Sequence, residues 1–294
     1  MRVFFRVMLA LGGFCVISGY CNAAFAYVKG IYVSQGTAEN SAKMTTLIQQ
    51  AKAAGVNTFV VDAAHRNTQY ASNMEKLRAS GIRYVARVVM FPGGGNHAQV
   101  TDPSIWAGRL ALAKYAVSVG AQEIQLDYIR YSSKTGSSPL KAQYVHNVIK
   151  YFKKNLPSDV KLQIDIFGVA AHKPSNTIGQ NVPMFASSLD AICPMVYPSH
   201  YEPYRYHATR PYNTVLNSVD ALQTQLKNNA NVKIYAYIES YNYRYPMSMS
   251  ERMSYTRAQI QAAKDGGAQG FFVWSAKNQY DVLFSVLRQD ASRT

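Results

Sequence analysis

The sequence has little cysteine and little negative charge. Three cysteines in 294 residues are too few for a disulfide scaffold or for a zinc module built from several cysteines. Asp and Glu together number 16 against 31 Lys and Arg, so the formal net charge is +15. Charged residues make up 16% of the chain and hydrophobic residues 48%, which excludes a disordered protein. Because carboxylates are so few, the position of each one in the fold helps to locate a catalytic site.

The first 26 residues have the features of a secretory signal peptide. Arg2 and Arg6 form a short basic region, an apolar run follows at residues 7–17, and Ala24-Phe25-Ala26 is a small-x-small cleavage site. The apolar run is shorter than the roughly 20 residues that a membrane span needs, which makes a transmembrane anchor the weaker interpretation. We therefore predict a cleaved signal peptide over residues 1–26. The mature protein is expected to be exported, periplasmic or secreted, with no stable membrane span.

Cleavage changes both the cysteine count and the charge. Cys15 and Cys21 leave with the signal peptide, so Cys193 remains without a disulfide partner. Loss of Arg2 and Arg6 takes the formal charge from +15 to +13. Such a charge attracts nucleic acid, anionic membranes or acidic polysaccharides. The chain has no run of five basic residues and no nucleic-acid-binding motif, and export argues against nucleic acid as a partner. An anionic glycan remains open.

After residue 26 the chain alternates between short β-branched or aromatic runs and stretches with helical periodicity. The predicted strands lie at residues 28–34, 58–62, 83–90, 123–131, 161–167, 190–196, 232–239 and 270–275. The predicted helices lie at residues 41–54, 73–80, 102–120, 139–155, 213–228, 250–265 and 280–288. After the fifth strand we predict only a long loop with a short turn at 183–187.

Eight strand–helix units are typical of a (β/α)8 TIM barrel, for which roughly 250 residues is usual. The alternative is an open doubly wound sheet, which usually carries a glycine-rich phosphate loop after its first strand. The corresponding segment here, Ser34-Gln35-Gly36-Thr37, lacks that pattern. We therefore predict a single α/β domain over residues 27–294, folded as a TIM barrel.

Four carboxylates lie at the C-terminal ends of predicted strands, the side of a TIM barrel that carries the active site. Because side chains alternate along a strand, Asp127, Asp165 and Glu239 are predicted to point into the barrel, and Asp62 ends the second strand. Ten of the other carboxylates are predicted at helix caps, helices, turns or strand starts. Glu39 and Glu202 lie in loops and keep a possible functional role.

Two carboxyl groups at one rim are what glycoside hydrolysis requires, one as general acid and one as nucleophile or base. Asp127 and Asp165 are on neighbouring strands, whereas Asp127 and Glu239 face each other across the barrel mouth, and the sequence does not choose between these pairs. The structural alternative for Asp127 is an ion pair with Arg130 or with inward-facing Arg87.

The same rim is rich in aromatic side chains, which stack on sugar rings. The structural alternative for each of them is that it only fills the barrel. Several histidines also lie in loops on this side, but H-x-H and H-E-x-x-H spacings are missing from the sequence, so we expect no metal and no cofactor.

Several blocks of the sequence occur in an order that resembles a known family. These blocks are Leu126-Asp127-Tyr128-Ile129-Arg130-Tyr131, Asp165-Ile166-Phe167-Gly168, Pro194-Met195-Val196-Tyr197-Pro198-Ser199-His200-Tyr201 and Phe272-Val273-Trp274-Ser275. Together they resemble the bacterial putative glycosyl hydrolase domain family, a TIM-barrel group distantly similar to the alpha-amylase superfamily. The resemblance implies a (β/α)8 fold and carbohydrate hydrolysis, with Asp127 as nucleophile. It does not extend to Glu239, because that family has a Gln-like position there.

The sequence therefore predicts an exported glycoside hydrolase that cleaves a poly- or oligosaccharide by a two-carboxylate mechanism. The alternative is a non-catalytic carbohydrate-binding TIM barrel of the cell envelope. We expect a monomer whose partner is a carbohydrate, neutral or anionic. The candidate catalytic residues are Asp127, Asp165 and Glu239. The candidate substrate-binding residues are Arg130, Tyr32, Asp62, Tyr197, His200, Tyr201, Tyr237 and Trp274.

Overall fold

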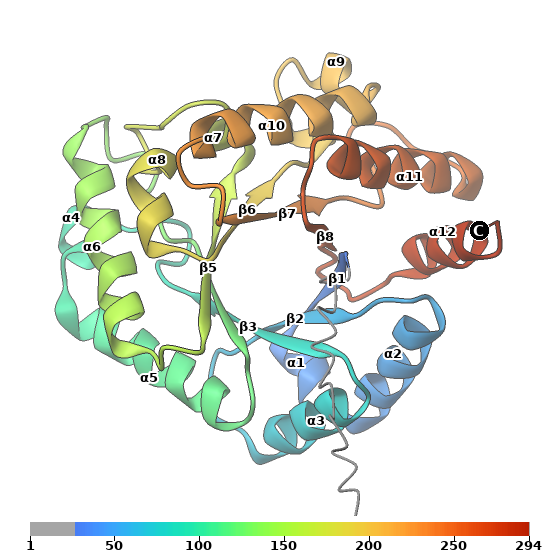
Figure 1. Cartoon of the computed structure of the whole chain (residues 1–294), viewed down its shortest axis with the longest axis horizontal. Helices are drawn as coiled ribbons and strands as arrows, with labels where there is room; N and C mark the ends of the chain where they lie inside the picture. The colour runs from blue at the N-terminus through green and yellow to red at the C-terminus, as the bar shows by residue number, and fades with distance from the viewer. Residues whose placement is uncertain (1–26, 294) are drawn as a thin grey trace, which may run out of the picture.

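The computed structural model describes residues 27–293, so the predicted signal peptide lies outside the described residues. Eight parallel strands pair in chain order and close into a barrel, and helices surround it (Figure 1). The strands are β1 (Val28–Val33), β2 (Thr58–Asp62), β3 (Arg83–Val89), β4 (Glu123–Asp127), β5 (Lys161–Phe167), β6 (Ala191–Met195), β7 (Lys233–Ile238) and β8 (Gly270–Val273). The predicted (β/α)8 fold is confirmed.

The longer helices form the outer ring and agree with the predicted ones to within a few residues. They are α2 (Ser41–Ala53), α3 (Thr68–Ala79), α5 (Pro103–Ser118), α6 (Leu140–Asn155), α10 (Pro211–Leu226), α11 (Met249–Asp265) and α12 (Asp281–Ala291). Short helices lie in the connections: α1 (Gln35–Ala38), α4 (His97–Val100), α7 (Gly168–His172), α8 (Val182–Phe185) and α9 (Tyr204–Ala208), with 3-10 turns η1 (Ala186–Ser188) and η2 (Pro198–His200). Most of these short elements were not predicted, because four or five residues carry too little periodicity. Among residues 27–293, no helix is long and apolar enough to cross a membrane.

The most informative difference from prediction is at the end of β4. We predicted a strand as far as residue 131, but β4 ends at Asp127. Tyr128 has a φ of 49°, in the left-handed region that non-glycine residues rarely adopt. This turn ends the regular alternation of side chains between the barrel interior and the helices. The direction of side chains after Asp127 therefore does not follow from the strand pattern.

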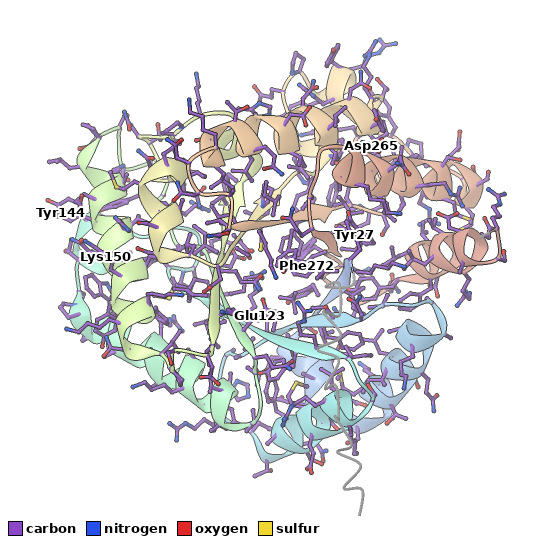
Figure 2. All side chains as sticks on the ribbon, viewed as in Figure 1. Tyr27, Glu123, Tyr144, Lys150, Asp265 and Phe272 are labelled. Atoms are coloured by element: carbon purple, nitrogen blue, oxygen red, sulfur yellow. The ribbon has the colours of Figure 1, made fainter. Side chains whose placement is uncertain are left out.

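The barrel interior combines an apolar layer with a polar one. Phe272, Tyr237 and Val60 are among its buried apolar residues, and Figure 2 labels Phe272 and Glu123 near the barrel centre. Gln125 Nε2 donates to Gln163 Oε1 at 2.9 Å, and the hydroxyl of Tyr237 donates to Gln125 Oε1 at 2.9 Å. Both glutamines therefore point into the barrel. This buried network forms the floor beneath the C-terminal end of the barrel.

Gly270 begins β8 and pairs with Val28 of β1, where the two strands close the barrel. A methyl group on Gly270 would overlap the Cβ atom and the backbone carbonyl oxygen of Val28. The carbonyl oxygen belongs to a paired strand, so it cannot move aside as a flexible side chain could. Gly270→Ala is therefore expected to lower the free energy of unfolding by about 1–3 kcal/mol, measured by urea denaturation. Gly36→Ala is the control, because no heavy atom lies within 4 Å of the added carbon. An equal loss in both variants would contradict the prediction.

Candidate active site

One guanidinium group lies between three carboxylates at the C-terminal end of the barrel. Arg87, near the end of β3, donates from Nε to Asp127 Oδ2 at 3.0 Å, from Nη2 to the same oxygen, and from Nη1 to Asp62 Oδ1. Asp165 Oδ2 lies 3.9 Å from Arg87 Nε. Of the two ion-pair partners considered for Asp127, the structure selects Arg87. The ends of β2, β4 and β5 thus meet around one positive charge from β3.

The cluster is largely removed from water, and this determines its electrostatics. The Arg87 side chain is 10% exposed. Burial opposes its charge, but Asp127, Asp62 and Asp165 outweigh that effect and raise the pKa of the guanidinium well above its ordinary value. Arg87 is therefore a permanent cation that holds the carboxylates around it.

Asp165 has an environment that differs from that of Asp127. It is 2% exposed, and its Oδ1 has no hydrogen-bond partner among the described residues. Burial, followed by the charge of Asp127, raises the pKa of the Asp165 carboxyl well above its ordinary value, and Arg87 offsets this only in part. Asp127, by contrast, bonds directly to Arg87 and also accepts the Tyr128 backbone N–H at Oδ1, 2.5 Å away. The neutral acid is therefore favoured at Asp165, whereas Asp127 has a cation bonded to it.

The two aspartates are close enough to act on one bond. Leu126 pairs with Ile164 in the parallel register of β4 and β5, so Asp127 and Asp165 are the next residues along these neighbouring strands. Both carboxyl groups also approach the same atom, Arg87 Nε, at 3.0 Å and 3.9 Å. Their Oδ2 atoms are therefore no more than about 7 Å apart, an upper bound that is compatible with the separations at which paired carboxylates hydrolyse glycosides.

Asp127 and Asp165 line a cavity of about 720 Å³ at the C-terminal end of the barrel. This volume falls within the usual range for small-molecule sites. The walls are mainly aromatic and come from loops that follow β4, β5, β6, β7 and β8. The aromatic and imidazole side chains in the lining are Tyr128, Phe167, Tyr197, His200, Tyr201, Tyr237, Tyr241, Tyr243 and Trp274. The cavity thus combines two carboxyl groups with flat apolar surfaces suited to sugar rings.

Five of the candidate substrate-binding residues line this cavity, and three do not. Tyr197, His200, Tyr201, Tyr237 and Trp274 are in its walls. The other three are Tyr32, Asp62 and Arg130, which support the cavity from behind.

The three supporting residues make well-defined contacts. The hydroxyl of Tyr32 donates to Asp62 Oδ2 at 2.5 Å, and the Arg87 guanidinium lies over the Tyr32 ring, 5.5 Å from its centroid. Arg130 donates to its neighbour's backbone oxygen at 3.0 Å and lies over the Phe167 ring at 4.4 Å. The turn at Tyr128 separates Arg130 from the alternation of β4, so its side chain is buried behind the wall. None of the three is in the lining of this cavity, and their role in substrate binding stays a prediction.

Glu239 follows β7 and does not itself line the cavity, although its Oε2 lies 3.7 Å from Nδ1 of His200, which does. It is 1% exposed and accepts hydrogen bonds from Ser199 N at 2.8 Å, Ser199 Oγ at 2.8 Å and the Tyr255 hydroxyl at 2.6 Å. Burial raises the pKa of Glu239 to about 7, while the hydrogen bonds from Tyr255 and Ser199 limit the rise. Ser199 belongs to η2, which is flanked by Tyr197 and Tyr201. Glu239 therefore anchors a loop of the cavity wall.

The sequence reasoning missed several residues of the cavity. Arg87 was considered only as a structural partner, although its inward parity on β3 was a usable signal. Tyr128 and Phe167 are not among the candidate residues. Tyr128 is positioned by a left-handed backbone turn that the sequence does not indicate, and Phe167 is the last residue of β5. Tyr241 and Tyr243 lie in the loop after β7, whose course the sequence pattern does not specify.

The histidines of the described chain are dispersed over separate contacts. His65 pairs with Glu39 at 2.7 Å, and His172 lies 3.1 Å from Ser218 Oγ. Within residues 27–293, no group of three or more His, Cys, Asp or Glu side chains has the arrangement of a metal site.

Arg87→Gln should be strongly destabilising, because it leaves the buried carboxylates without their cation. We expect a loss of about 3–5 kcal/mol in the free energy of unfolding at neutral pH, measured by urea denaturation. The loss should shrink at acidic pH, where the carboxylates are protonated. Arg257→Gln is the matched control. Its ion pair with Asp290, 2.9 Å long, is between partly exposed side chains, so a loss below about 1 kcal/mol is expected. Similar losses in the two variants would contradict the assigned role of Arg87.

Comparisons with known structures agree with this architecture. The chain is similar to the spore cortex-lytic enzyme SleL of Bacillus cereus, at 12% identity and a TM-score of 0.61, over 89% of this chain and 74% of that one. It is also similar to an endo-1,4-beta-D-mannanase of Thermotoga petrophila RKU-1, at 12% identity and a TM-score of 0.64, over 92% and 100% of the two chains. A chitinase from Chromobacterium violaceum gives 12% identity and a TM-score of 0.63, over 92% and 100%. At these identities the similarities establish the fold.

The sequence itself provides the family assignment. No curated protein matches it. A family model described as a putative glycosyl hydrolase domain matches residues 92–280, which is more than half of the chain and includes Asp127, Asp165 and most of the cavity wall. The chain therefore belongs to the putative glycosyl hydrolase domain family and is a glycosyl hydrolase-like TIM barrel.

Proposed function

We propose that the protein is an exported glycoside hydrolase that cleaves a poly- or oligosaccharide with Asp127 and Asp165 as its catalytic pair. The observation that carries the proposal is the opposite environment of these two carboxyl groups. One is bonded to Arg87, and the other is buried with an unpartnered oxygen. Both line the same cavity. A carboxyl group whose pKa is raised by burial, next to one that is bonded to a cation, is an arrangement suited to the acid and base roles of a hydrolase.

In the proposed reaction Asp165 acts as general acid and Asp127 as nucleophile or base. Asp165 donates its proton to the glycosidic oxygen while the bond from that oxygen to the anomeric carbon breaks. Asp127 either bonds to the anomeric carbon or takes a proton from the attacking water. Arg87 keeps Asp127 in its carboxylate form and fixes one of its oxygens. The separation of at most about 7 Å accommodates the retaining distance of roughly 5 Å and the lower part of the inverting range.

The aromatic walls are proposed to bind the sugar rings on either side of the cleaved bond. Tyr237 lies on β7, Trp274 follows β8 and Tyr197 follows β6, and all three line the same cavity as the aspartates. The neighbouring folds named as a mannanase, a chitinase and a spore cortex-lytic enzyme suggest polysaccharides to test first. Export, predicted from residues 1–26, would bring the protein to such polymers.

Replacement of the two aspartates tests this function. Asp127→Asn and Asp165→Asn should each lower kcat/KM for the cleaved glycan by about 10²–10⁴-fold or more, because nucleophile and general acid act in the transition state. Binding of the glycan, measured by calorimetry, should change little. Asp220→Asn, on the exposed face of α10, is the control and should retain full activity.

Two outcomes would contradict the proposal. Normal cleavage by Asp127→Asn would show that the site is wrong. If wild-type protein binds glycans from a broad panel but releases no reducing sugar from any of them, the chain is a carbohydrate-binding barrel and not a hydrolase.

We further propose that Glu239 is a positioning residue and not one of the catalytic pair. Glu239→Gln weakens its bonds to Ser199 and Tyr255 and should lower kcat/KM about ten-fold, as expected for the loss of one or two hydrogen bonds to a charged group. The fall of kcat at rising pH, caused by deprotonation of Asp165, should persist in this variant. If Glu239→Gln removes that fall in activity, Glu239 is itself the general acid.

The stability of the protein should carry a second signature of Glu239. Its pKa of about 7 in the fold exceeds its ordinary value of 4.5, so the folded state binds the proton more tightly than the unfolded state does. The corresponding stabilisation is complete below pH 4.5 and is lost as the pH rises through 7. Thermal denaturation at pH 5 and pH 8 should show a smaller decrease in Tm for Glu239→Gln than for wild type. An equal decrease would contradict this assignment.

A further inference from the structure

A second cavity, of about 440 Å³, lies beside the first at the ends of β7 and β8. The two cavities share Tyr241, Tyr243 and Trp274 in their linings. A chain of sugars that occupies the first cavity therefore has a direct path into the second, across an aromatic surface.

The second cavity differs from the first in charge. Arg252, in the first turn of α11, and Lys277, in the loop after β8, both line it. Neither forms an ion pair among the described residues, and Arg252 Nε is buried without a hydrogen-bond partner. Asp281 is the one carboxylate in the lining, so the formal charge of these groups is +1. An uncompensated, partly desolvated guanidinium is costly unless a ligand pairs with it.

The first cavity has the opposite character. Its cation, Arg87, is already bonded to Asp127 and Asp62. Asp127, Asp165 and Glu202 are carboxyl groups in its lining. An anionic sugar placed there would meet carboxylates instead of a free cation. The cleaved sugar is therefore expected to be neutral.

We propose that the second cavity is a subsite for a carboxylate-bearing sugar, which lies next to the neutral sugar held in the first cavity. Arg252 would bind the carboxylate through paired N–H donors, and Lys277 would add a second charge. The net charge of +13 after cleavage of the signal peptide would attract such a glycan from a distance. The proposal rests on the proposed function, since it extends the same binding site.

The carboxylate can belong to a uronic acid or to a lactyl ether on an amino sugar, and the chemistry at Arg252 is the same. Calorimetry with three hexasaccharides distinguishes them: fully N-acetylated chitohexaose, a hexamer with alternating uronic acids, and a hexamer with alternating lactyl-ether amino sugars. The measurements use Asp165→Asn protein, so that the bound glycan is not cleaved. Because the protonated Asp165 carboxyl and the Asn amide are both neutral, this substitution does not change the formal charge of the site.

At least one carboxylate-bearing hexamer should bind about ten-fold more tightly than chitohexaose, as expected for one or two charge-assisted hydrogen bonds. Arg252→Gln with Lys277→Gln should remove this preference and leave chitohexaose binding unchanged. Lys43→Gln with Lys150→Gln is the matched control, since it removes the same two charges from exposed positions on α2 and on the outer face of α6 (Figure 2). The control should retain the preference.

Three results would overturn the subsite: no preference for either acidic hexamer, a preference that survives the Arg252 and Lys277 substitutions, or an equal loss in the control, which would assign the preference to diffuse charge. None of these results affects cleavage by Asp127 and Asp165. Conversely, normal cleavage by Asp127→Asn would overturn the proposed function and leave the binding preference as measured.

Discussion

The contact of Arg87 with three carboxylates is the constraint on which the site depends. Its guanidinium bonds to Asp62 and Asp127 and lies 3.9 Å from Asp165. Without this cation, three acidic side chains could not share the end of a barrel at a tolerable electrostatic cost. Because Arg87 bonds directly to Asp127 and only approaches Asp165, it also makes the two aspartates unequal. The contacts of Arg87 therefore both stabilise this end of the barrel and distinguish the two aspartates chemically.

The two aspartates have different environments, which assigns a different chemical role to each side of the cavity. Burial raises the pKa of Asp165 and favours its neutral form, whereas Asp127 forms an ion pair with Arg87. The second cavity, with Arg252 and Lys277, adds a difference in charge along the aromatic surface. A glycan that is neutral at the cleaved bond and acidic in the next sugar would match both cavities. The basic residues would then act in two ways: Arg252 and Lys277 would bind the acidic sugar, and the net positive charge would attract the glycan.

The sequence predicted the residues that the strands themselves position. Side-chain parity placed Asp127 and Asp165 in the barrel because both lie on regular strands with a period of two. It did not apply where the strand stops: Glu239, which parity predicted to point inward, lies one residue past the end of β7 and bonds to Ser199 and Tyr255. The pairing of Arg87 depends on side-chain rotamers and on the closure of the barrel, neither of which a strand pattern specifies. The short helices in the connections are likewise set by tertiary contacts.

The most direct test of this account is the protonation state of Asp165, measured by carbon NMR of protein labelled at the aspartate carboxyl carbons. Loss of one signal in Asp165→Asn assigns the resonance. The account predicts that this carboxyl titrates well above the ordinary range for an aspartate, because burial and the charge of Asp127 raise its pKa. If Asp165 titrates in the ordinary range for an aspartate, close to pH 4, it cannot serve as the general acid, and the proposed division of roles between the two aspartates is wrong.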